Sequence, residues 1–137
     1  MSSDSDERYL ALRVVMMPRD TNPYGTIFGG VILSYIDQAG AVGARRELQA
    51  LEYPSQTLVT VAVDAVEFHE PVFVGDTVSF LTRLQKIGRT SIAMHVSVET
   101  ERAGIPHLLT QAQVTYVAVQ QDKVDGRRRP VSIKGSA

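Results

Sequence analysis

The chain of 137 residues contains no cysteine. Disulfide bridges, thiolate nucleophiles and zinc or iron–sulfur centres held by cysteine are therefore excluded. It also lacks an excess of charge of either sign, because 14 Lys and Arg residues stand against 15 Asp and Glu residues. Proteins whose main task is to grip nucleic acid carry a strong positive balance, so we expect no nucleic-acid partner.

The rest of the composition is typical of a folded protein, with 44% hydrophobic and 21% charged residues. The length suits one domain, and a chain of this size buries roughly two-thirds of its unfolded surface. We therefore predict a single domain over 1–137, with polar tails at 1–8 and about 121–137. The acidic, polar N-terminal segment is unlike a signal peptide, and we expect a cytoplasmic protein.

One hydrophobic run, 27–44, is long enough to raise the question of a membrane span. It is barely long enough to cross a bilayer, and it holds four glycines. Asp37 and Gln38 lie at its centre, where an acid and an amide would be costly in lipid. We interpret the run as a buried helix and expect no membrane partner.

The hydrophobic pattern predicts one helix and five strands. The apolar segment 27–48 is too long for a strand and favours a helix. Before it, 19–25 is dense in turn-forming residues and is predicted to be a loop. Strands are predicted, from β-branched or alternating residues, over 9–17, 57–69, 76–87, 90–101 and 107–119. Gly88-Arg89 predicts a two-residue type II′ hairpin turn, with glycine at its first central position.

One long helix among strands joined by short turns indicates an α+β protein, in which an antiparallel sheet wraps around the helix. In the predicted strand 90–101, one face is apolar, consisting of Ile92, Met94, Val96 and Val98. Such a half-wrapped helix leaves sheet edges exposed. We therefore expect a homo-oligomer, at least a dimer.

Three features of the segment 20–37 suggest chemistry. Asn22 lies in a loop that leads to the helix, where its amide can hydrogen-bond to a water or a carbonyl. Gly29 and Gly30 lie near the helix N-terminus, where unpaired N–H groups and the helix dipole stabilise negative charge. Asp37 follows two helical turns after Gly30, inside an otherwise apolar run.

Each feature also has a purely structural interpretation. Asn22 before Pro23 is a common turn residue, and Gly29-Gly30 can serve close packing of helix and sheet. Asp37, expected to be buried among its apolar neighbours, would cost several kcal/mol unless paired, so a structural ion pair is its alternative. A functional carboxylate is the stronger interpretation, because an idle buried charge is so unfavourable.

The segment 20–37 reads D-T-N-x-x-G-x-I-F-G-G-x-I-x-x-x-x-D, which resembles the signature of hotdog-fold acyl-CoA thioesterases. The resemblance is to the branch of small bacterial broad-range enzymes and cytosolic long-chain hydrolases. Three further segments resemble the same branch, namely Val59–Val63, Pro71–Asp76 and Ile87–Ser91. The resemblance covers roughly 10–120 and implies a hotdog fold, a long helix wrapped by an antiparallel sheet that joins edge to edge with that of a second subunit.

The resemblance implies that Asn22 and Asp37 are catalytic and come from opposite subunits of a dimer. The substrate-binding backbone would lie at Gly29 and Gly30, with the Gly30 N–H polarising the thioester carbonyl. Asp37 would act as general base on a water or attack the carbonyl directly, and the sequence leaves both open. Thr60 is a weaker candidate for orienting the water, and its alternative is an ordinary strand residue.

The substrate implied is acyl-CoA, whose phosphates need positive charge and backbone donors. Both are supplied by the predicted hairpin residues Gly88, Arg89, Thr90 and Ser91, for which a plain surface turn is the alternative. The basic triplet 127–129 could reach the nucleotide, but a solubilising tail is favoured. No metal and no cofactor is implied, since CoA belongs to substrate and product. A trimer of dimers is left open by the resemblance.

Two other functions stand as alternatives to hydrolysis. A hotdog-fold enoyl-CoA hydratase or dehydratase would need a histidine close to the loop of Asn22, but the first histidine in the chain is His69. We expect His69, His95 and His107 to be structural or exposed. A non-catalytic acyl-CoA-binding module would not need the acid at Asp37. Hydrolysis is the favoured function.

Overall fold

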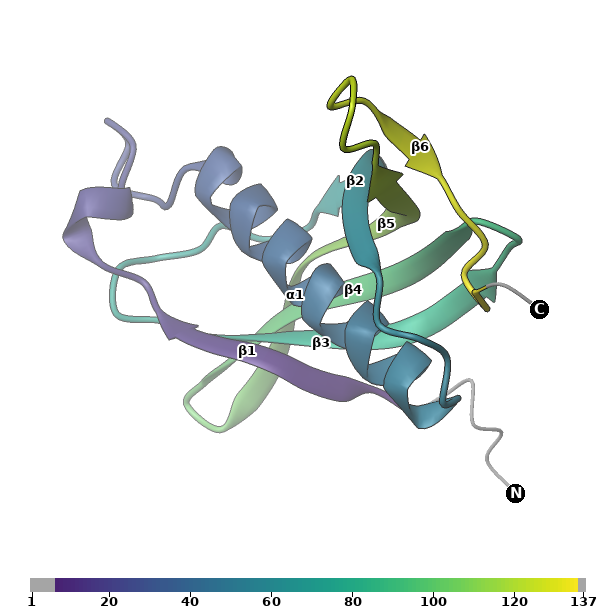
Figure 1. Ribbon diagram of the computed structural model, residues 1–137. Coiled ribbons are helices and arrows are strands. Elements are labelled where there is room, and N and C mark those ends of the chain that lie inside the picture. Colours follow the sequence, from purple (N-terminus) through teal and green to yellow (C-terminus); the bar gives the residue numbers. More distant parts are fainter. Residues whose placement is uncertain (1–6, 136–137) are drawn as a thin grey trace.

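A single long helix lies in the curve of an antiparallel sheet (Figure 1). The computed structural model describes residues 7–135. Its elements are, in chain order, β1 (Tyr9–Val15), the 3-10 helix η2 (Pro18–Asp20), α1 (Gly29–Ala50), β2 (Thr57–Phe68), β3 (Thr77–Ile87), β4 (Ser91–Arg102), β5 (Ile105–Gln121) and β6 (Arg128–Pro130). The predicted helix and five long strands, and the α+β class, are confirmed, with element ends that differ by about two residues.

The sheet has the strand order β1-β3-β4-β5-β2, and neighbouring strands are antiparallel. Its two edge strands, β1 and β2, lie on either side of α1 in Figure 1. On β2, Val61 and Val63 are 57% and 40% exposed. An edge strand that carries exposed apolar side chains is a surface for pairing with another chain. The exposed edge expected from the sequence is therefore present at β2.

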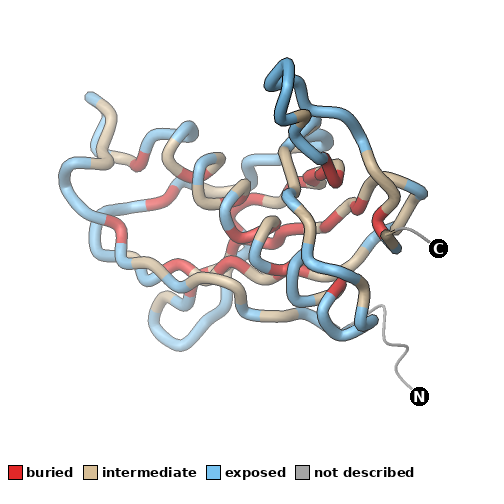
Figure 2. The backbone as a smooth tube through the Cα atoms, viewed as in Figure 1, coloured by how far each residue is buried: buried red, intermediate tan, exposed pale blue. Residues whose placement is uncertain are grey.

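The core lies between α1 and the inner face of the sheet, as the red segments of Figure 2 show. The alternation predicted for β4 is confirmed, because its apolar face is fully buried: Ile92, Met94, Val96 and Val98. Tyr116 on β5 and Phe80 on β3 are the largest fully buried side chains. Burial of this apolar area supplies the main driving force that holds helix and sheet together.

The helix α1 approaches the sheet closely at two glycines. A Cβ atom at Gly43 would lie 2.7 Å from Thr82 Cβ, and one at Gly40 would lie 3.2 Å from Tyr116 Cζ and closer still to its hydroxyl. Glycine at these positions therefore allows the two layers to meet. Among the described helices, none combines the length and apolar character needed to cross a bilayer.

The prediction of a two-residue type II′ turn between β3 and β4 was wrong. Ile87 pairs with Ile92, so the turn has four residues, and the Gly88 N–H donates to the Ser91 carbonyl (2.8 Å). Gly88 lacks the positive φ angle that a type II′ turn requires. The physical reason is long-range: the carbonyls of residues 89 and 90 accept N–H groups from residues 133 and 118, which hold the turn open.

The segment after β5, predicted to be a polar tail, adds the short strand β6. Arg128–Pro130 pairs with the end of β5, and the Val131 N–H donates to the Ala118 carbonyl (2.9 Å). Ile133 is 1% exposed and belongs to the core. This segment thus covers the end of the sheet next to the β3–β4 turn.

Candidate active site

Asp37 lies on the side of α1 that faces β2. Its carboxylate oxygen Oδ1 accepts a hydrogen bond from the Thr60 hydroxyl, with 2.6 Å between the oxygens. Within residues 7–135, the salt bridges do not include Asp37, so a structural ion pair is not its role here. The structure thus brings together two residues that the sequence had proposed separately.

The expected burial of Asp37 is corrected by the structure. Its neighbours Ile36, Ala39 and Gly40 are buried because they face the sheet, whereas Asp37 itself is half-buried. The full cost of enclosing a charge therefore does not apply to this protomer. A half-buried carboxylate with one hydroxyl donor can be reached by water and substrate.

Tyr116 is a second contact to Asp37, which the sequence analysis missed. Its hydroxyl donates to the backbone carbonyl of Asp37 (2.6 Å). Tyr116 lies directly opposite Thr60 in the register of β2 and β5, so one neighbour holds the Asp37 side chain and the other its main chain. Burial, and then the nearby Asp37, raise the pKa of Tyr116, which keeps its hydroxyl protonated as a donor.

A signal for Tyr116 was present in the sequence. A tyrosine in the middle of an alternating buried strand needs a partner for its hydroxyl. Gly40, one turn after Asp37, is the small residue that lets the hydroxyl approach α1. The sequence does not show that Gly40 and Tyr116 are in contact, because the way in which α1 crosses β5 determines which of their residues meet.

The start of α1 offers unused hydrogen-bond donors. Phe28 occupies the N-cap position and has no side-chain oxygen to cap the helix. Within the described part of the chain, the N–H groups of Gly29 and Gly30 donate none of the backbone hydrogen bonds of turns, loops and caps. A Cβ atom at Gly30 would meet nothing within 4 Å, so close helix–sheet packing does not explain this glycine. These free N–H groups and the helix dipole would stabilise a ligand atom with partial negative charge at the start of α1.

Asn22 closes its own loop. Its side-chain oxygen accepts the N–H groups of Tyr24 (2.9 Å) and Thr26 (3.1 Å), and its Nδ2 donates to the Thr26 hydroxyl (2.8 Å). These bonds fulfil the turn role proposed as an alternative and leave one amide hydrogen for another acceptor. Within residues 7–135, Asn22 has no hydrogen bond to Asp37.

The hairpin at 88–91 lies at the same end of the sheet as Thr60. Ser91 pairs with Val117 on β5, and Val117 pairs with Val59 on β2. Two strand spacings of about 4.8 Å separate the hairpin from this part of β2, or roughly 10 Å. Arg89 is exposed there. In the basic triplet, Arg129 forms an ion pair with Asp122 (3.0 Å), which supports its surface role.

The three histidines bond to other side chains. His107 lies 3.0 Å from Glu70, His69 lies 3.4 Å from Glu67, and His95 lies 3.3 Å from Gln111. Burial, and then the charge of nearby arginines, lower the pKa of His95. Within residues 7–135 none of the histidines forms a hydrogen bond to Asn22 or Asp37, and no group of three His, Asp or Glu side chains is placed to hold a metal ion.

Comparison with known sequences points to one family. The thioesterase superfamily matches residues 24–106. The acyl-CoA thioester hydrolase YciA of Salmonella typhimurium is 38% identical over 131 residues, which are 92% of each chain. An uncharacterized acyl-CoA thioester hydrolase of Zymomonas mobilis is 41% identical over 128 residues, which are 90% of this chain and 76% of its own.

Solved structures agree with the sequence relatives. A hexameric hotdog-fold thioesterase of Campylobacter jejuni has 42% identity and a TM-score of 0.71, with 90% of each chain covered. A hexameric broad-specificity acyl-coenzyme A thioesterase, solved with an aspartate replaced by alanine, has 35% identity and a TM-score of 0.77, with 91% of this chain and 86% of its own covered. The chain therefore belongs to the thioesterase superfamily and has the hotdog fold.

Proposed function

We propose that this protein hydrolyses acyl-CoA thioesters to a free fatty acid and CoA, at a site that two protomers share. Relatives that match along most of their length are acyl-CoA thioester hydrolases. The observation that carries the proposal is the half-buried Asp37 carboxylate, held by Thr60 and free of a cation within the described residues. Such a carboxylate can take a proton from water or attack a carbonyl.

The spacing along α1 supports a shared site. Gly30 and Asp37 are seven residues apart, which corresponds to about 10 Å along a helix at about 1.5 Å per residue. Reacting groups must approach to about 3–3.5 Å, so one carbonyl cannot meet both residues of the same helix. A second copy, joined at the exposed edge of β2, can supply the missing half.

In this arrangement one protomer contributes the start of α1 and the loop before it. The Gly30 N–H polarises the thioester carbonyl and stabilises the oxyanion, and Asn22 uses its remaining amide hydrogen to hold a water. Asp37 of the partner subunit acts on the carbonyl carbon from the other side.

Two routes follow for Asp37. As a base, it takes a proton from the water while the water oxygen bonds to the carbonyl carbon. The C–S bond then breaks, and the proton held by Asp37 passes to the leaving CoA thiolate. As a nucleophile, it displaces the thiolate to form a mixed anhydride, which water then hydrolyses. Both routes end in a fatty acid and CoA.

In this proposal the hairpin Gly88, Arg89, Thr90 and Ser91 binds the phosphate-bearing part of CoA. The exposed Arg89, at the same end of the sheet as Thr60, supports that role. The protein would act as a homo-oligomer with a dimer as its smallest active unit, and its related structures are described as hexameric. A cytoplasmic location stays a prediction.

The direct test is release of CoA thiol from a panel of acyl-CoAs, detected with a thiol reagent. We expect Asp37→Asn to abolish release without lowering the melting temperature, because the amide keeps the shape but is neither base nor nucleophile. Loss of stability with activity retained would contradict the proposal. Water addition to an enoyl-CoA without thiol release would indicate a hydratase, and binding with neither reaction an acyl-CoA-binding module.

A mixing experiment tests the shared site. Asp37→Asn and Asn22→Ala chains are each expected to be inactive, but a mixed dimer has one intact site. Random co-assembly makes half of the dimers mixed, so about a quarter of the wild-type activity should return for a two-fold symmetric dimer. No recovery, with mixed dimers verified by mass spectrometry, would show that each chain holds a complete site.

A further inference from the structure

Arg102, the last residue of β4, binds the segment that connects β2 to β3. Two N–H groups of its guanidinium donate to the two carboxylate oxygens of Asp76, at 2.6 and 3.4 Å, and one also donates to the Pro71 carbonyl (2.9 Å). The guanidinium lies 5.0 Å from the centre of the Phe73 ring. The side chains of Arg102 and Asp76 are only 25% and 13% exposed, so water competes weakly for this paired geometry. Arg102 thus holds both ends of segment 71–76.

The Asp76 carboxylate also closes the turn within this segment. The oxygen that lies closest to Arg102 accepts the Phe73 N–H as well (2.9 Å), and the Asp76 N–H donates to the Phe73 carbonyl (3.1 Å). Removing the cation would leave a poorly hydrated charge, and the cost of that charge favours moving the carboxylate toward water. The position of the Phe73 backbone therefore depends on Arg102.

The backbone next to Phe73 supports the loop that precedes α1. The Ile27 N–H donates to the Val72 carbonyl (2.8 Å), and Thr26 forms a β-bridge with Phe73. Both Ile27 and Val72 are buried, and Figure 1 shows the β2–β3 connection beside the start of α1. Across the described residues, the other backbone hydrogen bonds of this loop stay within 17–32. The loop therefore takes its place in the fold from Val72 and Phe73.

Two groups of the proposed reaction lie on either side of this contact. Asn22 is bonded to Thr26 through its side chain and through its own N–H, which donates to the Thr26 carbonyl (2.8 Å). Gly30 follows Ile27 by three residues, in the first turn of α1. A shift of this contact would therefore move the Asn22 amide and the Gly30 N–H together. Misplacing reacting groups by about 1 Å can cost roughly a hundredfold in rate.

Arg102 also reaches the wall of a pocket beside the helix start. The pocket has a volume of about 280 Å³, and its lining includes Gly29 and Glu70. The Glu70 carboxylate lies 3.7 Å from the Arg102 guanidinium and 3.0 Å from His107 Nδ1. Arg102 is thus linked to the start of α1 along two routes, one through the backbone and the other through Glu70.

We propose that Arg102 is a positioning residue, which holds the loop before α1 in the geometry that the reaction requires. It acts through Asp76 and the Val72 carbonyl and touches no reacting atom. The inference rests on the proposed function, which gives this loop its part in the reaction. Misplaced donors weaken the transition state more than the bound ground state, so loss of Arg102 lowers kcat and leaves KM nearly unchanged.

The first test compares the steady-state kinetics of Arg102→Met and the wild type on one acyl-CoA. Methionine keeps an apolar stem against Phe73 but removes the charge and the N–H groups. We expect kcat to fall about tenfold to a hundredfold with KM nearly unchanged. Arg102→Lys keeps a charge opposite Asp76 and should recover part of the loss. It also takes the place of Arg102→Met in every test if that variant does not fold.

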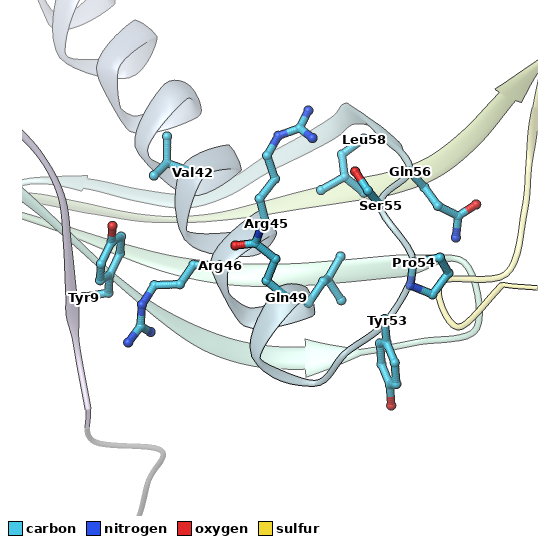
Figure 3. Close-up of a pocket in the computed structure, with 11 residues that line it drawn as sticks. Tyr9, Val42, Arg45, Arg46, Gln49, Tyr53, Pro54, Ser55, Gln56 and Leu58 are labelled. Atoms are coloured by element: carbon cyan, nitrogen blue, oxygen red, sulfur yellow. The ribbon is translucent and has the colours of Figure 1, made fainter.

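Arg46→Met is the matched control. Arg46 lies over an aromatic ring and beside a carboxylate, as Arg102 does, with Tyr9 at 4.4 Å and Glu47 at 3.4 Å. Figure 3 shows it extending toward Tyr9 near the end of α1. Arg46 follows Gly30 by 16 residues, or about 24 Å along the helix, so its loss should leave kcat at the wild-type value.

A mixing experiment shows which half of the shared site Arg102 serves. In a mixed dimer of Arg102→Met and Asp37→Asn chains, one site combines an intact loop with an intact acid, so about a quarter of the wild-type activity should return. With Asn22→Ala chains both sites keep a damaged loop, so no recovery is expected. A general effect of Arg102 on folding or assembly would not distinguish the two partner chains.

Three results would overturn the inference: an unchanged kcat, recovery with Asn22→Ala chains, and no recovery with Asp37→Asn chains. If Asn22→Ala and Asp37→Asn chains do not complement each other, or the wild type hydrolyses no acyl-CoA, the proposed function fails instead. Hydrogen exchange of the peptide 21–30 then decides separately on Arg102. Exchange there should be faster in Arg102→Met than in the wild type and in Arg46→Met, and equal rates would overturn the inference.

Discussion

The contact between Gly40 and Tyr116 predicts a measurable coupling at the helix turn that carries Asp37. We consider Gly40→Ala, which adds one methyl group on the buried side of α1. The new Cβ would lie 3.2 Å from Tyr116 Cζ and closer still to the hydroxyl, where atoms cannot overlap. Since Tyr116 is fully buried and its hydroxyl is bound to the Asp37 carbonyl at 2.6 Å, neither group can move alone.

The magnitude follows from two opposing effects. Replacing glycine by alanine inside a helix stabilises it by about 1 kcal/mol. Forcing an additional methyl group into a packed core costs about 1–3 kcal/mol, and a buried hydroxyl that loses its acceptor costs about 1–3 kcal/mol more. We therefore expect a net loss of about 3 kcal/mol in the free energy of unfolding. For a chain of this size that is a fall of roughly 10–15 °C in Tm.

The assay is a double-mutant cycle measured by denaturant unfolding at one fixed protomer concentration, because oligomers gain stability by mass action. Tyr116→Phe alone should cost about 1 kcal/mol through the lost hydrogen bond. The Tyr116→Phe variant lacks the hydroxyl that lies nearest to the new methyl group. In that variant, Gly40→Ala should therefore lower the free energy of unfolding by a smaller amount. The coupling free energy should be at least about 1 kcal/mol. Ser34→Ala, at an exposed position of α1, controls for helix propensity.

Two outcomes would refute this reasoning. Additive effects, within the roughly 0.5 kcal/mol typical of independent sites, would show that Gly40 and Tyr116 do not meet in solution. A stabilised Gly40→Ala variant would show that α1 has room to move away from β5. Because the same contact holds the Asp37 main chain, the destabilised variant should also lose activity toward acyl-CoA.

Three further outcomes are expected. Thr60→Val keeps the shape but removes the hydrogen bond to Asp37, so kcat should fall about tenfold with Tm unchanged, and an unaltered kcat would remove Thr60 from the site. Gly30→Pro removes one N–H in the first helical turn, where proline is tolerated, and should lower kcat about 10²–10³-fold with α1 retained by circular dichroism. Burial raises the pKa of Asp76, but the hydrogen bond and charge of Arg102 outweigh it and hold that pKa below the ordinary 3.8. This stabilisation is therefore present at neutral pH and is lost as pH falls through the lowered pKa. The difference in unfolding free energy between the wild type and Asp76→Asn should shrink below about pH 4, and a constant difference would contradict the pairing.

Local sequence patterns were sufficient for the elements and for the motif at the start of α1. The long apolar run could only be a helix, and the alternation around Met94 could only be a half-covered strand, because these periods follow from backbone geometry. The segment that contains Asn22, Gly30 and Asp37 could be recognised because its residues are close together in the chain.

The tertiary structure decided which of these residues meet, because contacts between distant segments depend on strand register and on the crossing of helix and sheet. The Tyr116 hydroxyl reaches Asp37 only because α1 crosses β5 at Gly40. The half-buried state of Asp37 follows from its position toward the edge strand β2, which helical periodicity alone does not reveal. The turn after β3 is bonded to Ala118 on β5 and to Ile133, and the strand β6 is paired with the end of β5, so both depend on long-range backbone bonds that have no local signal.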